Sequence, residues 1–377
     1  MQNHDVTKRR KFLKQAMQVA GAMALPGVAA AQAKSPVRDF KGQTLTALVY
    51  SGINENTWRK HFVPQFEAAT GAKVVIDAAW TEGIAKLKTA PAGQAPFDLL
   101  MTDPMQGYPS IDEGLFRKVD FKSIPNMQRF HKKILQGRVY DEQWGVPLIS
   151  SAMTLGWNTE AVGSGLESWQ QLLEAPVRGN MMLYSLFYMS LYTFAAMKAA
   201  KERAVGKAGE MMMSDIDGVL RFARDNKDAV KYWWPSTADA VNALARKNVI
   251  AGNIHGNGLL APMRDKKPVA GMIPLGDVAY VQLFLVVPKG VRNPALAEAA
   301  LNHYCSEEFQ RALAETGELP SNIPTIAQAY GQKDKVWSVA YPDTPAEFDA
   351  LQYYPYDAYF KHLGKIRTTW DREILRK

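Results

Sequence analysis

Hydrophobic runs of strand length alternate with amphipathic stretches of helix length along most of the chain. Residues 44–50 are rich in β-formers, and apolar side chains then recur at helical spacing until Thr70-Gly71. Further apolar runs follow at 73–79 and 97–101. Alternation of this kind predicts an α/β fold with a mostly parallel sheet. Ligands of such sheets lie beyond the carboxyl ends of the strands, so the residues just after 50 and 101 are expected near a site.

Residues 145–158 form the stretch around which the rest is arranged. Pro147 suits the start of a strand, and the small polar pair Ser150 and Ser151 lies at the centre of an otherwise apolar run. One interpretation is a strand that crosses from a first α/β lobe to a second, with a ligand cleft beside it. The alternative is an ordinary core strand whose serines bond to backbone.

A second set of elements follows this stretch. Strands are expected at 179–184, 230–234 and 249–254, with helices at 186–204, 215–225 and 238–247, whereas the methionine-rich segment 206–213 is interpreted as a loop. Residues 278–287 would cross back, followed by a helix pair over 294–317. The predicted domains are therefore lobe 1, residues 40–149 and 284–319, and lobe 2, residues 150–283 and 320–377. The crossing strands would serve as the hinge.

Composition and charge narrow the functional classes. The 377 residues are 47% hydrophobic and 22% charged, which is typical of a soluble globular protein of about two domains. The net charge is +8, but residues 1–33 contribute +4 of it (five basic residues and one aspartate), so +4 remains for the rest. With no dense basic run elsewhere, no nucleic-acid partner is expected. The single cysteine excludes an internal disulfide.

Residues 1–33 have the pattern of an export signal. Arg9-Arg10 is followed by Lys-Phe-Leu-Lys, a mildly apolar alanine-rich stretch and small residues at 29–33. The pattern resembles a twin-arginine (Tat) signal peptide, and a Sec signal that carries two arginines is the alternative. No lipobox cysteine lies near the cleavage site, and no later segment has about eighteen uninterrupted apolar residues. A soluble periplasmic protein is expected.

Several short motifs, in a fixed order, resemble the family-1 extracellular solute-binding proteins of ABC importers. They begin with Phe66, Thr70-Gly71 and Lys73-Val-Val, an F-x-x-x-T-G-x-K-V pattern, and continue at 85–89, 97–100, 113–120, 144–147, 155–158, 168–169 and 310–317. The spermidine/putrescine-binding branch is the most similar. The resemblance implies a two-lobed periplasmic-binding-protein fold of type II, a soluble monomer without cofactor, and an ABC permease as partner.

The resemblance also implies which positions line the cleft. Carried over by position, the ligand-binding residues would be Ser51, Gly52, Thr102, Asp103, Ser150, Ser151, Tyr184, Ser185, His255, Asn257, Tyr280 and Gln282. Asp103 could instead cap its own helix, and His255 could be a core histidine.

This pocket departs from the polyamine pattern. Ser185 stands where an acidic residue is usual and Leu283 where a second carboxylate is usual, so Asp103 offers the single negative charge, beside Tyr184, Tyr188 and Tyr280. A diamine would leave one ammonium unmatched, at a cost of several kcal/mol. A small polar solute, amino-acid-like or polyamine-related, is therefore expected.

Other functional classes have less support. The six histidines show no metal-ligand spacing, and no nucleophile-elbow, Walker or dinucleotide motif is present. The adjacent Tyr353 and Tyr354 are the one hint of a ferric-iron carrier. We therefore expect no enzyme and no metal, with a metal or anion carrier, or an exported enzyme on the same scaffold, as the alternatives.

Overall fold

The computed structural model describes residues 39–274 and 276–376. The predicted export signal lies outside these residues. In the part of the chain that the structure describes, no helix is both long and apolar enough to span a bilayer.

One mixed sheet runs through the described residues. Its main path follows the order β2-β1-β3-β10-β5-β8-β6-β7, with β4 paired to β10 and β9 paired to β5. The strands are β1 (Thr44–Val49), β2 (Lys73–Ala78), β3 (Leu99–Thr102), β4 (Phe116–Arg117), β5 (Gly145–Asn158), β6 (Met181–Tyr184), β7 (Val230–Trp234), β8 (Ala251–His255), β9 (Val269–Met272) and β10 (Tyr280–Pro288). The parallel pairs β2-β1-β3 and β8-β6-β7 confirm the expected α/β alternation on both sides.

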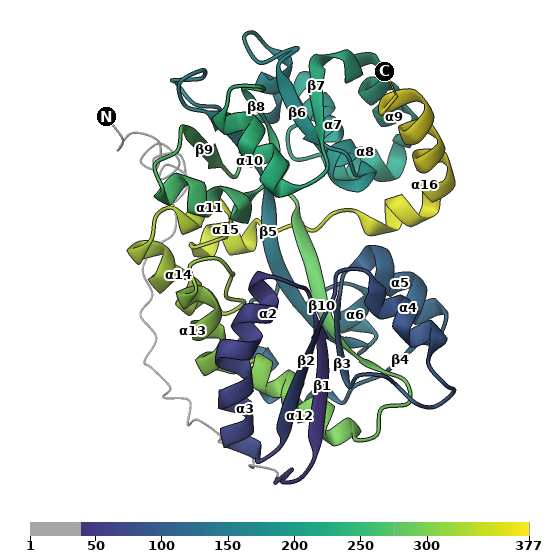
Figure 1. Ribbon diagram of the computed structural model, residues 1–377. Helices are drawn as coiled ribbons and strands as arrows, with labels where there is room; N and C mark the ends of the chain where they lie inside the picture. Colours follow the sequence, from purple (N-terminus) through teal and green to yellow (C-terminus); the bar gives the residue numbers. More distant parts are fainter. Residues whose placement is uncertain (1–38, 275, 377) are drawn as a thin grey trace, which may run out of the picture. The chain divides into compact units, whose positions relative to one another are not determined.

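Two antiparallel strands join the two sides of this sheet. The long strand β5 pairs with β10 at one end and with β8 and β9 at the other, and Figure 1 shows β5 and β10 passing between the lower and upper groups of elements. The expected crossover at 145–158 is therefore confirmed as one continuous strand. The ladder of β5 and β10 contains an irregularity between Tyr280 and Gln282.

Helices cover the sheet in both groups. The first group has α2 (Ile53–Thr57), the π-helical turn η1 (Trp58–Phe62), α3 (Val63–Thr70), α4 (Glu82–Thr89), α5 (Pro104–Asp112), α6 (Arg138–Asp141), α12 (Pro294–Tyr304) and α13 (Glu307–Glu315). The second has α7 (Phe187–Lys201), α8 (Ala208–Ser214), α9 (Ile216–Asn226), α10 (Thr237–Ala245) and α11 (Gly256–Arg264). Gly71, with φ +73°, ends α3 in the left-handed conformation, as the Thr-Gly pair predicts.

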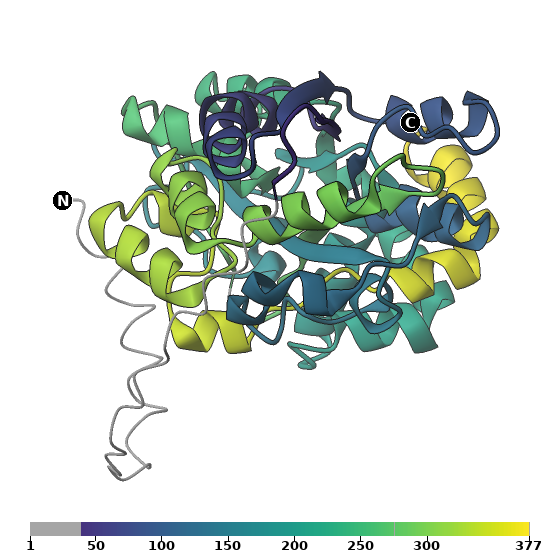
Figure 2. The same ribbon diagram turned by 90° about the horizontal axis from the view of Figure 1, so that it is seen from below.

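The C-terminal segment contacts both groups. It contains α14 (Pro324–Lys333), α15 (Pro345–Asp349) and α16 (Tyr356–Thr369), of which α14 packs on α13 and α16 packs on α7, α8 and α9. Figures 1 and 2 show α16 (yellow) beside α5 (blue), where the rings of Tyr108 and Phe360 lie 5.9 Å apart. The lobe boundaries given above remain a prediction.

One local expectation was wrong. Residues 206–213 are not a loop, because Ala208–Ser214 is the helix α8, whose Ala208 and Met212 are fully buried. In the same group of elements, α11 begins at Gly256. A Cβ at Gly256 would lie 2.4 Å from the Thr154 hydroxyl, so this glycine permits close packing of a helix on β5.

Candidate functional site

The carboxyl ends of β2, β1 and β3 place three candidate side chains in a row. Because these strands are parallel and adjacent, the residues that follow them lie at one edge of the sheet. Trp80 follows β2, Tyr50 follows β1 and Asp103 follows β3. The rings of Trp80 and Tyr50 stack with centroids 5.1 Å apart, and the Tyr50 hydroxyl donates to Asp103 Oδ2 at 2.9 Å.

Asp103 is a half-buried carboxylate that hydrogen bonds already hold in place. As N-cap of α5 it accepts from the Met105 N–H at 2.8 Å, and Oδ2 also accepts from Gln106 Nε2 at 3.2 Å. The cap that the sequence offered as one alternative is therefore present, and Asp103 also lies at the predicted edge of the sheet, whereas its contact with a ligand stays a prediction. Within the described residues, no basic side chain forms an ion pair with Asp103. Burial raises the pKa of Asp103, and the hydrogen bonds from Tyr50, Met105 and Gln106 lower it in part.

Ser51 and Gly52 continue the same edge. Gly52 has φ +85°, is exposed, and lies one residue before α2. The backbone N–H of Asn56 donates to its carbonyl at 2.9 Å, which starts the helix. Thr102 is buried as the last residue of β3. These positions lie beside Tyr50 and Asp103, as the topology of the sheet predicts.

In the second group of elements, three rings form an aromatic wall at the ends of β6, β7 and β8: Tyr184, Trp234 and His255. Tyr184 at the end of β6 stacks on Trp234 at the end of β7, with centroids 4.1 Å apart. The ring of His255, which ends β8, meets Tyr184 edge-on at 5.3 Å. Burial lowers the pKa of His255 to about 4, so the imidazole is neutral near pH 7. This wall therefore offers π faces and a neutral nitrogen rather than charge.

Tyr188 of α7 lies within electrostatic reach of Asp103 in the first group of elements and of Tyr184 in the second. Burial raises the pKa of its hydroxyl, and the negative charge of Asp103 raises it further, as do Tyr354 and Tyr184. Asp103 has the same effect on Tyr50 and on Tyr356 of α16. The carboxylate therefore lies within electrostatic reach of hydroxyls from β1, α7 and α16.

The remaining candidates lie on or beside the crossing strands. Ser151 is buried and its hydroxyl donates to Asn257 Oδ1 of α11 at 3.4 Å, whereas Ser150 is half-buried. The backbone of Ser185 is engaged on both sides: its N–H donates to the Trp234 carbonyl at 3.0 Å, and its own carbonyl accepts from Trp370 Nε1 at 2.9 Å. These contacts hold the end of β6 next to the aromatic wall.

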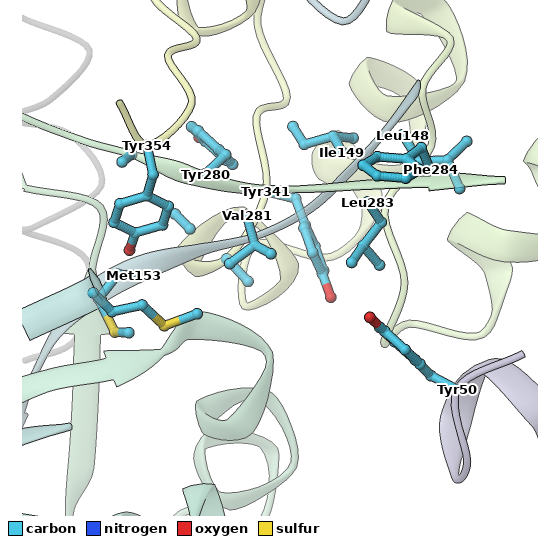
Figure 3. Close-up of a cluster of buried hydrophobic side chains, with 14 of the residues drawn as sticks. Tyr50, Leu148, Ile149, Met153, Tyr280, Val281, Leu283, Phe284, Tyr341 and Tyr354 are labelled. Carbon is cyan, nitrogen blue, oxygen red and sulfur yellow. The ribbon is translucent and has the colours of Figure 1, made fainter. Parts of the chain in front are cut away.

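Gln282 and Tyr280 lie on β10, the second of the crossing strands. Gln282 is buried, and its Nε2 donates to the Gln136 carbonyl at 3.2 Å. Figure 3 shows Val281 and Leu283 on one side of β10 and Tyr280 on the other. Leu283 lines a cavity of about 20 Å³ together with Asn54, Met101, Leu148, Ile149, Ser150, Tyr304, Leu313, Leu319 and Pro320. A cavity of this size holds a water molecule, not an organic solute.

The sequence analysis did not include Trp80 among the candidate residues. Its position could have indicated it, because Trp80 immediately follows the apolar run 73–79, and that run ends at the same sheet edge as Tyr50. Among residues 39–274 and 276–376, no group of three or more His, Cys, Asp or Glu is arranged to hold a metal ion.

Comparison with known proteins now identifies the family. Residues 62–346 match the family model described as bacterial extracellular solute-binding protein. The chain belongs to this family. Members are substrate-binding components of transporters rather than enzymes, so this solute-binding protein is the periplasmic solute-binding component of an ABC transporter and works with a permease. The resemblance drawn from the short motifs is thereby confirmed.

Solved structures agree on the fold of this solute-binding protein. An ABC transporter protein from Clostridium perfringens ATCC 13124 is 16% identical with a TM-score of 0.72, covering 88% of this chain and 99% of that one. The Atu4243 GABA receptor is 17% identical with a TM-score of 0.71, covering 89% and 98%. A putative spermidine/putrescine ABC transporter from Listeria monocytogenes is 14% identical with a TM-score of 0.62, covering 89% and 100%. They support the two-lobed fold. A search of curated protein sequences found no match.

Proposed function

We propose that the protein captures a small amino-acid-like solute that carries one ammonium group, and delivers it to its permease. The observation that carries this proposal is the Asp103 carboxylate, which is partly buried and, among the described residues, has no cationic partner. A carboxylate removed from water without a counter-charge is costly. An ammonium group supplied by the solute would offset that cost, so binding and ionisation of Asp103 favour each other.

The number of nearby carboxylates argues for one positive charge rather than two. Asp103 is the one described carboxylate whose charge influences the hydroxyls of Tyr50, Tyr188 and Tyr356. A second ammonium would find phenol oxygens and π faces but no second charge. The uncharged polar groups of Ser51, Ser150 and Asn257 are then available to the polar end of the solute. One structural neighbour is described as a GABA receptor and another as a putative spermidine/putrescine transporter, and both descriptions support an amine.

The test compares solutes and two matched variants by isothermal titration and thermal shift. The panel is GABA, neutral α-amino acids, putrescine, spermidine, succinate and ferric citrate. A monoamine should bind the wild type, and Asp103→Asn should weaken it about thirtyfold or more, which corresponds to about 2 kcal/mol, the lower end for breaking a buried charge pair. An asparagine still caps α5, so folding is retained.

Asp98→Asn is the control. Asp98 is also a partly buried carboxylate that accepts one backbone hydrogen bond, from Thr46 at 2.8 Å, but it precedes β3 rather than following it. It should leave affinity unchanged. Equal affinity of wild type and Asp103→Asn would contradict the proposal, as would tight binding of succinate alone.

The affinity should also fall as pH falls through the pKa of Asp103. Protonation removes the charge that the ammonium requires, and because burial raises that pKa the loss begins above the range of an ordinary aspartate. Titrations over a pH series test this. We further propose twin-arginine export and a monomeric state, which a signal-peptide reporter fusion and sedimentation equilibrium would test.

A further inference from the structure

The connection from β6 to α7, residues 184–188, carries part of the candidate site. It contains Tyr184 and Ser185, and Tyr188 lies in the first turn of α7. Leu186, the N-cap residue, forms no side-chain capping bond and is 46% exposed. An uncapped helix start has few local contacts that would fix it. The positions of Ser185 and Tyr188 therefore depend on other elements.

The C-terminal segment supplies two hydrogen-bond donors to this connection. Tyr359 of α16 donates its hydroxyl to the Tyr188 carbonyl. Trp370, which begins the π-helical turn η7 (Trp370–Ile374), donates Nε1–H to the Ser185 carbonyl at 2.9 Å. Tyr359 is 0% exposed and Trp370 is 1% exposed, so neither side chain is open to a solute. What these two side chains can affect is the placement of residues 184–188.

The same helix also contacts the first group of elements close to Asp103. The ring of Phe360 lies 5.9 Å from that of Tyr108, and the ring of Tyr356 lies 6.1 Å from it. Tyr108 belongs to α5, the helix that Asp103 caps, and Figure 1 shows α16 beside this helix. The neighbouring residues Tyr359 and Phe360 thus contact the two different parts of the candidate site.

We propose that Tyr359 and Trp370 are positioning residues, which hold Ser185 and Tyr188 in place opposite Asp103 before a solute binds. The inference rests on the proposed function and adds two residues that act without touching the solute. A connection that is already ordered in the free protein avoids the cost of ordering it during binding. The C-terminal segment would then determine affinity through the arrangement of the site rather than through a contact of its own.

The test uses Tyr359→Phe, Trp370→Phe and the double variant, each of which removes a donor and keeps an aromatic ring. Tyr341→Phe and Trp337→Phe are the matched controls. Both residues lie in the same C-terminal segment and are equally buried, but they donate to the carbonyls of residues 318–319, just after α13. Trp337 Nε1 lies 3.1 Å from its acceptor.

Hydrogen exchange followed by mass spectrometry measures the order of residues 184–190 in the free protein. Exchange there should be about fivefold faster in Trp370→Phe, which corresponds to about 1 kcal/mol for one lost hydrogen bond, and faster still in the double variant. Both controls should exchange at the wild-type rate. Saturating solute should restore slow exchange in the double variant, because binding selects the ordered connection.

Titration with the tightest-binding solute of the panel measures the consequence for binding. If about a tenth of the double-variant molecules keep the ordered connection, the affinity falls about tenfold, whereas Trp337→Phe should leave it unchanged. Faster exchange without loss of affinity would overturn the inference, because the two bonds would then serve stability alone. Unchanged exchange, or an equal loss of affinity in Trp337→Phe, would also overturn it. If succinate proves to be the tightest binder, the proposed ammonium is refuted while this comparison still decides the role of Tyr359 and Trp370.

Discussion

Replacing His303 by leucine should remove part of the protein's sensitivity to acid. His303 lies on α12 against an aromatic cluster, with ring centroids 5.1 Å from Phe62, 5.6 Å from Phe66 and 6.3 Å from Phe309. Its Nε2 is buried, and no hydrogen-bond partner for it occurs among the described residues. Burial lowers the pKa of His303 to about 4, from an ordinary value of 6.5.

The sign and size of the effect follow from this shift. The unfolded chain binds a proton at His303 below about pH 6.5, whereas the folded protein does so only below about pH 4, so the free energy of unfolding falls as pH falls through this window. Between about pH 7.5 and about pH 5 the loss from this residue is about 2 kcal/mol. Leucine has a similar size and no titrating group, and it also removes the unpaired nitrogen.

Urea denaturation at these two pH values measures the effect. The variant should lose about 2 kcal/mol less than the wild type on acidification. Phe309→Leu is the control from the same cluster: it loses packing, so its free energy of unfolding should drop by a similar amount at both pH values. If His303→Leu and the wild type lose the same free energy between the two pH values, the buried imidazole is not the acid-sensitive group.

Three further predictions concern packing and charge. Asn253→Ala should lower the free energy of unfolding by about 3 kcal/mol in urea titrations, because its amide donates to Ser190 and Thr193 inside the core and those hydroxyls would lose their partner. Gly107→Ala should cost about 2 kcal/mol or more in the same assay, since a Cβ would lie 2.2 Å from the Phe284 ring, whereas an alanine at the open helical position 364 should be neutral or stabilising. Asp103→Asn should stabilise the solute-free protein near neutral pH, because the raised pKa means that ionisation opposes folding. That gain should vanish below about pH 4, where wild-type Asp103 is protonated in both states, and a gain that is independent of pH would contradict it.

Local patterns predicted the strands of the main path through the sheet, because each apolar run is bounded by turn residues. They did not predict the short strands β4 and β9 or the helices α11, α14, α15 and α16. The failures have particular physical causes. Gly206 suggested a loop, yet the next residues form α8 because Ala208 and Met212, one helical turn apart, are both buried. The π-helical turn η1 has no local signal that sequence reasoning could use.

Candidate positions could be predicted from the sequence where the topology of the sheet alone determines them. The ends of the first and third strands predicted Ser51, Gly52, Thr102 and Asp103. The hydrogen bond between Tyr50 and Asp103 could not be predicted, because it depends on the adjacency of two strands that are far apart in the chain. Gln282 was assigned by a carry-over of position alone. Its side chain donates to the Gln136 carbonyl, and a register irregularity lies beside Tyr280, so its role in binding stays a prediction.

The position of β10 in the sheet has a consequence for biosynthesis. This strand lies between β3 and β5, yet it is the last strand to leave the ribosome. Until it arrives, β3 and β5 each present an unpaired edge in the nascent chain, because β10 is the neighbour that both of them lack. The first group of elements therefore cannot complete its sheet during translation. Folding must wait for nearly the whole polypeptide, an interval in which a chaperone that shields these edges would prevent aggregation.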